Sequence, residues 1–145
     1  GEFKVVGSLI SNSFWCFDVE DNAYALLKSD TGVVAMLHSS ATQWRHSFRL
    51  EVTLEKGAID LSGILTDSKS YGEETLRVLD TNQIDISGKP VVVVKEYKQD
   101  LSWRKETEEF IREVKGETVE RVGTLAEAYK TLELVMAIYS AAEEH

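Results

Sequence analysis

The sequence predicts an α+β fold: an open, mainly antiparallel β-sheet with two C-terminal helices on one face and the other face available for dimerisation. Strand-like segments fill the first two thirds of the chain, and short turns join them. Near residue 102 the apolar period changes to that of amphipathic helices. Strands first and helices afterwards favour an antiparallel sheet over alternating βαβ units.

The strands are predicted from alternation and from turn residues. Apolar and polar side chains alternate from Phe48 to Leu54, and Glu55-Lys56-Gly57 supplies a turn into the next strand at 58–61. The same reasoning predicts strands at 3–9, 23–28, 33–41, 75–79 and 91–97.

Two helices are predicted from their caps and their apolar faces. Ser102 is expected to cap the first helix, and Gly116 is suited to end it. Thr124 and Glu127 form a capping box that opens the second helix. Its inner stripe is predicted to be Leu125, Ala128, Leu132, Val135, Met136 and Tyr139.

Composition excludes several classes of function. The 145 residues suit one domain, and a net charge of -9 would repel nucleic acid. No apolar run approaches the roughly 20 residues of a membrane helix. Cys16 is the one cysteine, so no intrachain disulfide can form and a reducing cytoplasm is the expected compartment.

Motifs for catalysis, cofactors and metals are missing from the sequence. Neither glycine-rich phosphate-binding spacing occurs, and G-x-S-x-G is absent. A zinc site is not expected, because Cys16, His38, His46 and His145 are scattered. Cys16 is interpreted as a small packed residue rather than a nucleophile. The chain is therefore expected to hold no catalytic residue, cofactor or metal of its own.

The polar segment 37–49 is the best candidate for a binding site. Read as a continuous strand, it has no consistently apolar face, and each unpaired buried polar group would cost about 1–3 kcal/mol. It is therefore expected to border a polar site, a sheet edge or an interface. A planar ring, an amide, an imidazole and a cation suit polyhydroxylated or phosphorylated ligands, and the candidate residues are Gln43, Trp44, Arg45 and His46, with Tyr71 as second choice.

Three acidic residues, Asp18, Glu20 and Asp21, precede the strand at 23–28. They could bind a cation or orient a substrate hydroxyl. A strand-entry turn is the preferred interpretation, because Asp favours such turns.

In these segments the sequence resembles the C-terminal domain of the glucose-fructose oxidoreductase, inositol dehydrogenase and MocA (Gfo/Idh/MocA) family. The matching pieces cover nearly the whole chain; they are VEDNAYALLKSDTGVVAMLHSSATQW, LEVTLEKGAIDLSG, SYGEETL, SWRKETEEFI and AYKTLELVMAIYSAA. The resemblance implies an open sheet that follows a Rossmann domain, with the outer sheet face used for subunit contact. Residues 1–145 are then a single C-terminal substrate and oligomerisation domain.

The departures from the family pattern concern catalysis. The glycine-rich turn, the E-K-P lysine and the D-x-x-x-H motif have no counterpart, since Lys56 precedes Gly57 in a hairpin. By analogy the D-x-x-x-H motif would lie upstream of Gly1, and the N-terminal Rossmann domain is expected to be absent from this chain. The resemblance implies a full-length parent that binds NAD or NADP and oxidises or reduces a sugar, a sugar derivative or a cyclitol. This fragment alone is expected to be inactive.

Two further interpretations stay open. One is a stand-alone small-molecule binding module of helix-grip type, in which a curved sheet wraps a long helix. The other is a purely structural dimerisation domain, with the polar strand at a two-fold interface.

Overall fold

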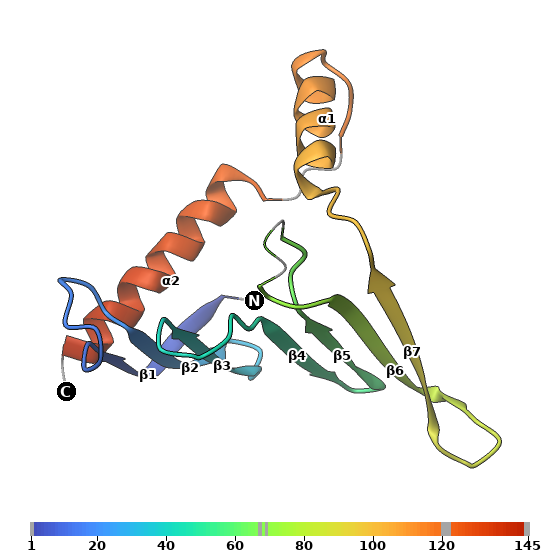
Figure 1. The fold of residues 1–145 in the computed structure, drawn as a ribbon, viewed down its shortest axis with the longest axis horizontal. Helices are drawn as coiled ribbons and strands as arrows, with labels where there is room; N and C mark the ends of the chain where they lie inside the picture. The colour runs from blue at the N-terminus through green and yellow to red at the C-terminus, as the bar shows by residue number, and fades with distance from the viewer. Residues whose placement is uncertain (1, 67, 69, 120–122, 144–145) are drawn as a thin grey trace. The chain divides into compact units, whose positions relative to one another are not determined.

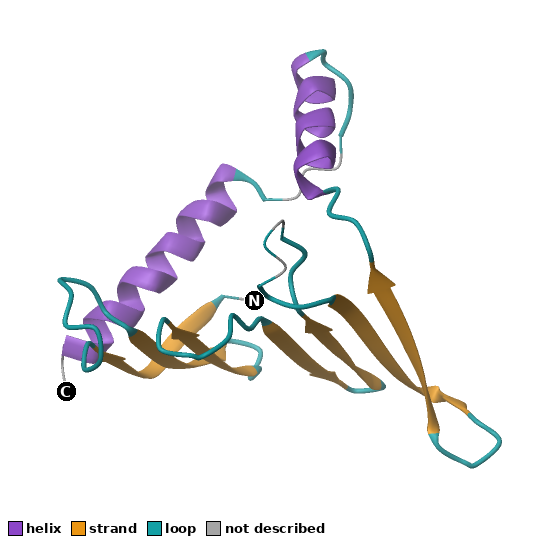
Figure 2. Ribbon diagram, in the orientation of Figure 1, coloured by secondary structure: helices purple, strands orange, loops and turns teal. Residues whose placement is uncertain are grey.

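The computed structural model describes residues 2–66, 68, 70–119 and 123–143. They belong to two compact units: a terminal unit of residues 1–42 and 120–145, and a central unit of residues 43–119. Each unit has one antiparallel sheet and one helix (Figure 1; Figure 2). The predicted α+β class, the antiparallel pairing and the two C-terminal helices are confirmed. The strands are divided between a sheet of three and a sheet of four.

The terminal unit contains the first three strands, in the order β1-β2-β3. These are β1 (Phe3–Ser11), β2 (Asn22–Ser29) and β3 (Val34–Ser40). Between β2 and β3, the Ser29 hydroxyl accepts a hydrogen bond of 3.0 Å from the backbone N–H of Val33. This side-chain bond closes the predicted turn.

Helix α2 (Leu125–Glu143) opens with the predicted capping box. The backbone N–H of Thr124 donates to the Glu127 carboxylate at 2.7 Å, and the N–H of Glu127 donates back to the Thr124 hydroxyl at 3.3 Å. Two N–H groups that the first turn leaves without helical partners are thereby satisfied.

The core of the terminal unit lies between the sheet and α2. Ala25, Leu27 and Ile138 are its buried apolar residues among those described. The partly buried side chains around them are Phe3, Val5, Ile10, Ala35 and Leu134. The sheet thus covers one side of α2, at Leu134 and Ile138.

The predicted inner stripe of α2 is wrong. Leu125 is 88% exposed and Met136 is 57% exposed, whereas Ile138 is 7% exposed. The helix carries apolar residues around most of its circumference, so periodicity alone could not tell which side meets the sheet. The packing of β1 and β2 against α2 determined which side of the helix is buried.

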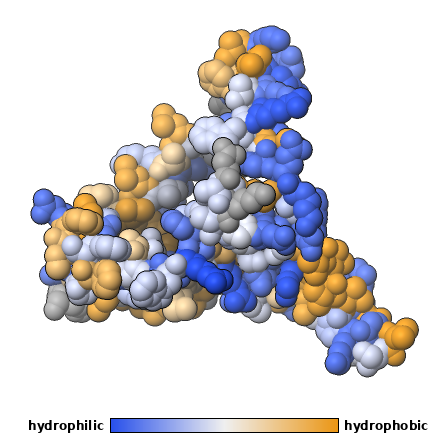
Figure 3. Space-filling view, viewed as in Figure 1, coloured by the Kyte–Doolittle hydropathy of each residue, from blue (hydrophilic) through white to orange (hydrophobic). Residues whose placement is uncertain are grey.

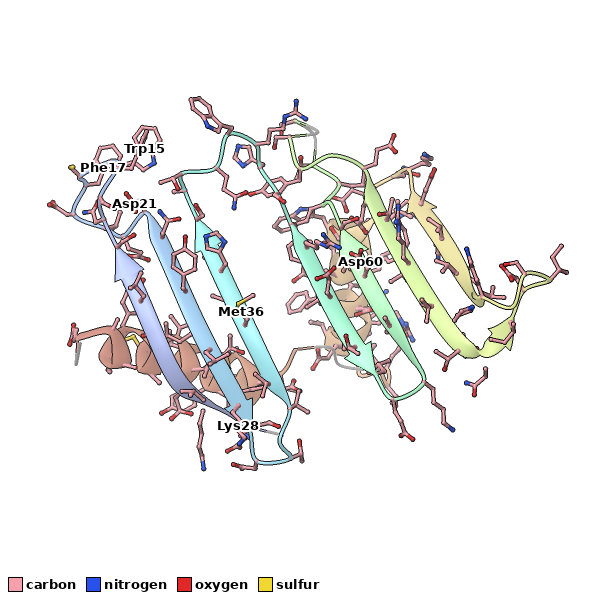
Figure 4. The ribbon with its side chains drawn as sticks, turned by 90° about the horizontal axis from the view of Figure 1, so that it is seen from below. Trp15, Phe17, Asp21, Lys28, Met36 and Asp60 are labelled. Carbon is pink, nitrogen blue, oxygen red and sulfur yellow. The ribbon has the colours of Figure 1, made fainter. Side chains whose placement is uncertain are left out.

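The side of the three-stranded sheet opposite α2 is called the outer face here. Successive side chains of a strand point to opposite faces, and cross-strand partners share a face. The residues that point to the outer face include Lys4, Leu9, Tyr24, Leu26, Lys28, Val34, Met36 and His38. Figure 4 shows Met36 near the middle of this face, with Lys28 toward one end of the strands and Asp21 at the other. Met36 is 86% exposed, so the outer face is uncovered.

The central unit contains the four-stranded sheet, in the order β4-β5-β6-β7. Its strands are β4 (Arg49–Leu54), β5 (Gly57–Ser62), β6 (Glu74–Ile84) and β7 (Pro90–Tyr97). One face is mostly apolar, with rows such as Val52, Ile59 and Val78. The other carries the charged row Glu51, Asp60 and Arg77, and Asp60 is labelled in Figure 4.

Helix α1 (Ser102–Val114) follows β7 in the central unit. Leu101 occupies its N-cap position, and the Ser102 hydroxyl donates to Asp100 at 2.6 Å, so the prediction that Ser102 is the cap is wrong. The C-terminal prediction is confirmed: Gly116 has φ 80°, and the N–H of Glu117 donates to the Arg112 carbonyl at 3.0 Å.

Much apolar surface is open to solvent in both units, as the orange areas of Figure 3 show. In α1, Trp103 is 78% and Val114 71% exposed. Large exposed apolar patches mark interaction surfaces. No helix among the described residues is both long and apolar enough to cross a membrane.

Candidate functional site

The predicted binding residues gather at one end of the central sheet. Strand β4 begins there, β5 ends, β6 begins and β7 ends, so the adjoining segments 43–48, 63–66, 70–73 and 98–101 lie at the same end. The backbone N–H of Gly63 donates to the Phe48 carbonyl at 3.0 Å, which joins two of these segments. We call this region the sheet-end site.

Gly63 allows the chain to turn tightly at this site. Its φ is 74°, and a Cβ at this position would lie 2.1 Å from the carbonyl oxygen of Glu73. Only glycine tolerates both the left-handed backbone and this close approach. The next loop is held by the Glu74 carboxylate, which accepts a hydrogen bond of 3.1 Å from the N–H of Leu65.

Two of the predicted residues are in contact. The rings of His46 and Tyr71 have centroids 4.9 Å apart at an interplanar angle of 53°. Tyr71 is half-buried and His46 is exposed. The pair presents an imidazole and a phenol side by side, two groups that can donate and accept hydrogen bonds.

The other three predicted residues lie on the surface before β4. Gln43 and Arg45 are exposed, and the side chain of Trp44 is fully exposed, at 102% of its reference accessible surface. A fully exposed tryptophan contributes little to packing, which leaves its ring face free for a ligand or a partner. The structure therefore brings His46 and Tyr71 together and leaves Gln43, Trp44 and Arg45 at the surface.

The predicted continuous strand from residue 37 to 49 is wrong. Strand β3 ends at Ser40, and residues 41–48 are irregular. The Ser40 hydroxyl accepts the N–H of Thr42 at 3.1 Å, and the Thr42 hydroxyl bonds with Asn22, which diverts the chain from the ladder. The compact units divide between Thr42 and Gln43, so His38 and Trp44 do not share a strand face.

A hollow of about 680 Å³ in the central unit was not predicted. It lies where loop 64–66 meets the end of β7 and the first turn of α1. Its charged, amide and aromatic lining residues are Glu74, Tyr97, Gln99, Asp100, Trp103 and Lys105. Trp103, an aromatic residue in the first turn of α1, is the sequence feature that could have indicated it.

The two carboxylates of the hollow, Asp100 and Glu74, are held by hydrogen bonds from neighbouring residues. Hydrogen bonds from the Ser102 hydroxyl and N–H hold the pKa of Asp100 below its usual value. Glu74 is tied to Leu65, as described above. The hollow thus offers fixed acceptors beside two aromatic rings and an ammonium group, a combination suited to binding rather than to nucleophilic attack.

The acidic residues before β2 have a structural role at Asp21. Its carboxylate accepts the N–H of Phe14 at 2.7 Å and that of Trp15 at 3.3 Å, and the residue is 3% exposed. These bonds, led by the one from Phe14, lower the pKa of Asp21. Figure 4 shows Asp21 beneath the loop that carries Trp15 and Phe17. This agrees with the preferred interpretation as a turn.

Glu20 and Cys16 lie in the same loop as Trp15 and Phe17. The Tyr139 hydroxyl of α2 donates to the Glu20 carboxylate and lowers its pKa. Cys16 is exposed with φ 55°, so the expectation that it is packed is wrong. Among the described residues, no three His, Cys, Asp or Glu side chains are grouped to hold a metal ion.

Comparison with known proteins gives a likeness of fold. No protein-family model matches the chain, and no curated protein matches it. The chain is similar to a crystal structure from Erwinia carotovora atroseptica, a protein assigned as an oxidoreductase, with a TM-score of 0.62 and 18% sequence identity. The match covers 97% of this chain and 41% of that one, so the chain spans less than half of the length of the Erwinia protein.

Proposed function

We propose that the chain is the substrate-binding and dimerisation domain of an NAD(P)-dependent oxidoreductase of the Gfo/Idh/MocA type. Its substrate would be a sugar, a sugar derivative or a cyclitol. The observation that carries the proposal is the fold likeness over 97% of the chain to part of a protein assigned as an oxidoreductase. The family segments quoted above support it, and the single cysteine favours a cytoplasmic protein.

The nicotinamide cofactor does not fit the residues of this chain. Dinucleotides bind at a glycine-rich turn between a parallel strand and the helix of a βαβ unit. Both sheets here are antiparallel throughout their described strands. We therefore assign cofactor binding and hydride transfer to a preceding Rossmann domain, and to this chain only the binding and orientation of substrate.

The sheet-end site is the proposed contribution to substrate binding. His46 and Tyr71 would hydrogen bond to substrate hydroxyls, and the open ring face of Trp44 would pack on the apolar face of a sugar ring. Arg45 supplies a fixed cation for a phosphorylated or carboxylated substrate, and Gln43 an amide. These groups act by positioning, and none of them needs to react.

The first test is the reading frame upstream of Gly1. A G-x-G-x-x-G turn followed by E-K-P and D-x-x-x-H supports the proposal, and an upstream region without a Rossmann pattern contradicts it.

The second test is steady-state kinetics of the parent enzyme. Trp44→Ala should raise KM about tenfold with little change in kcat, because the ring would bind substrate and transition state alike. Ile86→Ala is the matched control, since Ile86 is equally exposed, at 110%, on the hairpin at the other end of the sheet. Unchanged KM values in both Trp44→Ala and His46→Ala would remove the sheet-end site from the proposal.

The outer face of the terminal unit is the proposed dimer surface. Its middle is apolar, with Leu9 59% and Met36 86% exposed. Lys28 lies toward one end of the strands, and the loop with the exposed carboxylate of Asp18 adjoins the other end. At the Lys28 end, Lys4 is already paired with Asp30 at 3.3 Å. Under a two-fold axis, Lys28 of one copy would face the Asp18 end of the other, as a self-complementary interface requires.

Sedimentation equilibrium tests the dimer surface directly. Met36→Asp places a charge in the apolar middle and should convert a dimer into a monomer. Ile86→Asp adds the same charge outside the outer face and should leave the dimer intact. A dimer that survives Met36→Asp contradicts this assignment.

A further inference from the structure

The outer face carries one imidazole, that of His38, among its described residues. Strand β3 alternates so that Val34, Met36 and His38 point to this face. The His38 ring stacks on the ring of Tyr24, its partner across the strands, with centroids 4.3 Å apart and an interplanar angle of 10°. An imidazole thus lies within a surface that is otherwise apolar at its middle.

The described outer-face positions of β1, β2 and β3 carry no carboxylate beside His38. On the outer face, β2 contributes the Tyr24 phenol and Lys28, and β1 contributes Lys4. In the loop at the near end, the Asp21 carboxylate accepts the N–H groups of Phe14 and Trp15, and Glu20 accepts the Tyr139 hydroxyl. The third carboxylate of this loop, Asp18, is exposed and lies outside the strands of the outer face. The next pair of residues along β2 and β3 on this face is Asn22 and Ser40, and both side chains are neutral.

We propose that His38 makes self-association through the outer face dependent on pH, with the neutral imidazole permitting the dimer and the protonated imidazole opposing it. The inference rests on the proposed dimer surface. In the free chain an imidazolium is solvated and stacks on Tyr24 as a cation on an aromatic ring. In the dimer the same cation would be buried without a partner, which is strongly unfavourable.

Proton linkage fixes the direction in which pH changes self-association. Protons bind only to the separated chains, so association weakens as the pH falls through the range in which imidazoles titrate. A symmetric dimer has two such sites, so protonation of either chain opposes association, and the dimer present at pH 7.5 should be lost at pH 5.5.

The experiment is sedimentation equilibrium of the 145-residue chain at pH 7.5, 6.5 and 5.5 and constant ionic strength. His38→Phe keeps a flat ring beside Tyr24 without a titratable proton, and should dimerise equally at all three values. His38→Lys carries a permanent cation and should dimerise weakly throughout. Circular dichroism at each pH checks that the variants are folded.

The possible outcomes distinguish the role of His38 from the proposed dimer surface. A dimer whose pH response disappears in His38→Phe and that is weak at every pH in His38→Lys supports both. A dimer that ignores pH, or whose pH response survives in His38→Phe, overturns the role of His38 and leaves the dimer surface standing. A chain that is monomeric at every pH, with a folded spectrum, overturns both.

Discussion

The hydroxyl of Ser8 in β1 donates a hydrogen bond of 2.7 Å to the backbone carbonyl of Ile138 in α2. This bond joins the edge strand to the helix at the residue that anchors the small core. Ile138 is 7% exposed, and it packs with Ala25 and Leu27. Among the described residues, the buried apolar contacts between sheet and helix are centred on this region.

Truncation at this contact should destabilise the terminal unit. Ile138→Ala is expected to lower the free energy of unfolding by about 2–4 kcal/mol through lost burial and a residual cavity. Ser8→Ala should cost about 1 kcal/mol, the usual value of a hydrogen bond. Leu125→Ala, at a residue 88% exposed on the same helix, is the control and should stay within about 0.5 kcal/mol. Urea denaturation measures all three, and equal losses for Ile138→Ala and Leu125→Ala would mean that α2 packs by its other side.

The turn at the sheet-end site should depend on glycine at one position and tolerate alanine at another. Gly63→Ala is expected to cost more than about 2 kcal/mol, because its Cβ would lie 2.1 Å from the Glu73 carbonyl oxygen. Gly72→Ala is the matched control: its φ is 78°, but nothing lies within 4 Å of the added atom. Backbone strain alone should lower the free energy of unfolding of the Gly72→Ala variant by about 1–2 kcal/mol. Thermal denaturation of the two variants compares them, and a larger loss for Gly72→Ala would contradict the packing at Gly63.

Asp21→Asn should weaken the fold at neutral pH and have little effect in strong acid. The folded-state pKa of Asp21 is lowered, first by the N–H of Phe14, so its ionised form stabilises the fold above the unfolded value of about 3.9. That contribution is lost as the pH falls through the lower folded value. Urea midpoints of wild type and variant should therefore differ at pH 7 and converge once the pH has fallen below the lowered folded-state pKa of Asp21. Asp18→Asn, on the same loop but exposed, is the control, and a gap that persists unchanged in acid would exclude this role of the carboxylate.

The two helix starts should respond differently to loss of a hydroxyl. Thr124→Ala removes half of the capping box of α2 and should cost about 1 kcal/mol. Ser102→Ala should cost less than about 0.5 kcal/mol, because the Ser102 hydroxyl bonds an exposed carboxylate and does not cap α1. Urea denaturation separates these values, and a larger loss for Ser102→Ala would restore Ser102 as the cap.

Local chemistry determined much of the fold from sequence alone. Alternation from Phe48 to Leu54 and the turn at Gly57 predicted a hairpin that is present as β4 and β5. The capping box at Thr124 and the stop at Gly116 are also as predicted, because both depend on residues a few positions apart. Such signals need no knowledge of distant segments.

Tertiary structure decided which side of an element packs and where polar segments end. Helix α2 is apolar around most of its surface, so only contact with β1 and β2 could select Ile138 over Met136. The end of β3 at Ser40 depends on Asn22, the first residue of β2, and on Asp21 just before it, whose carbonyl accepts the N–H of Ala41. The contact of His46 with Tyr71 also depends on tertiary structure, because strand ends that are distant in sequence meet at one end of the central sheet.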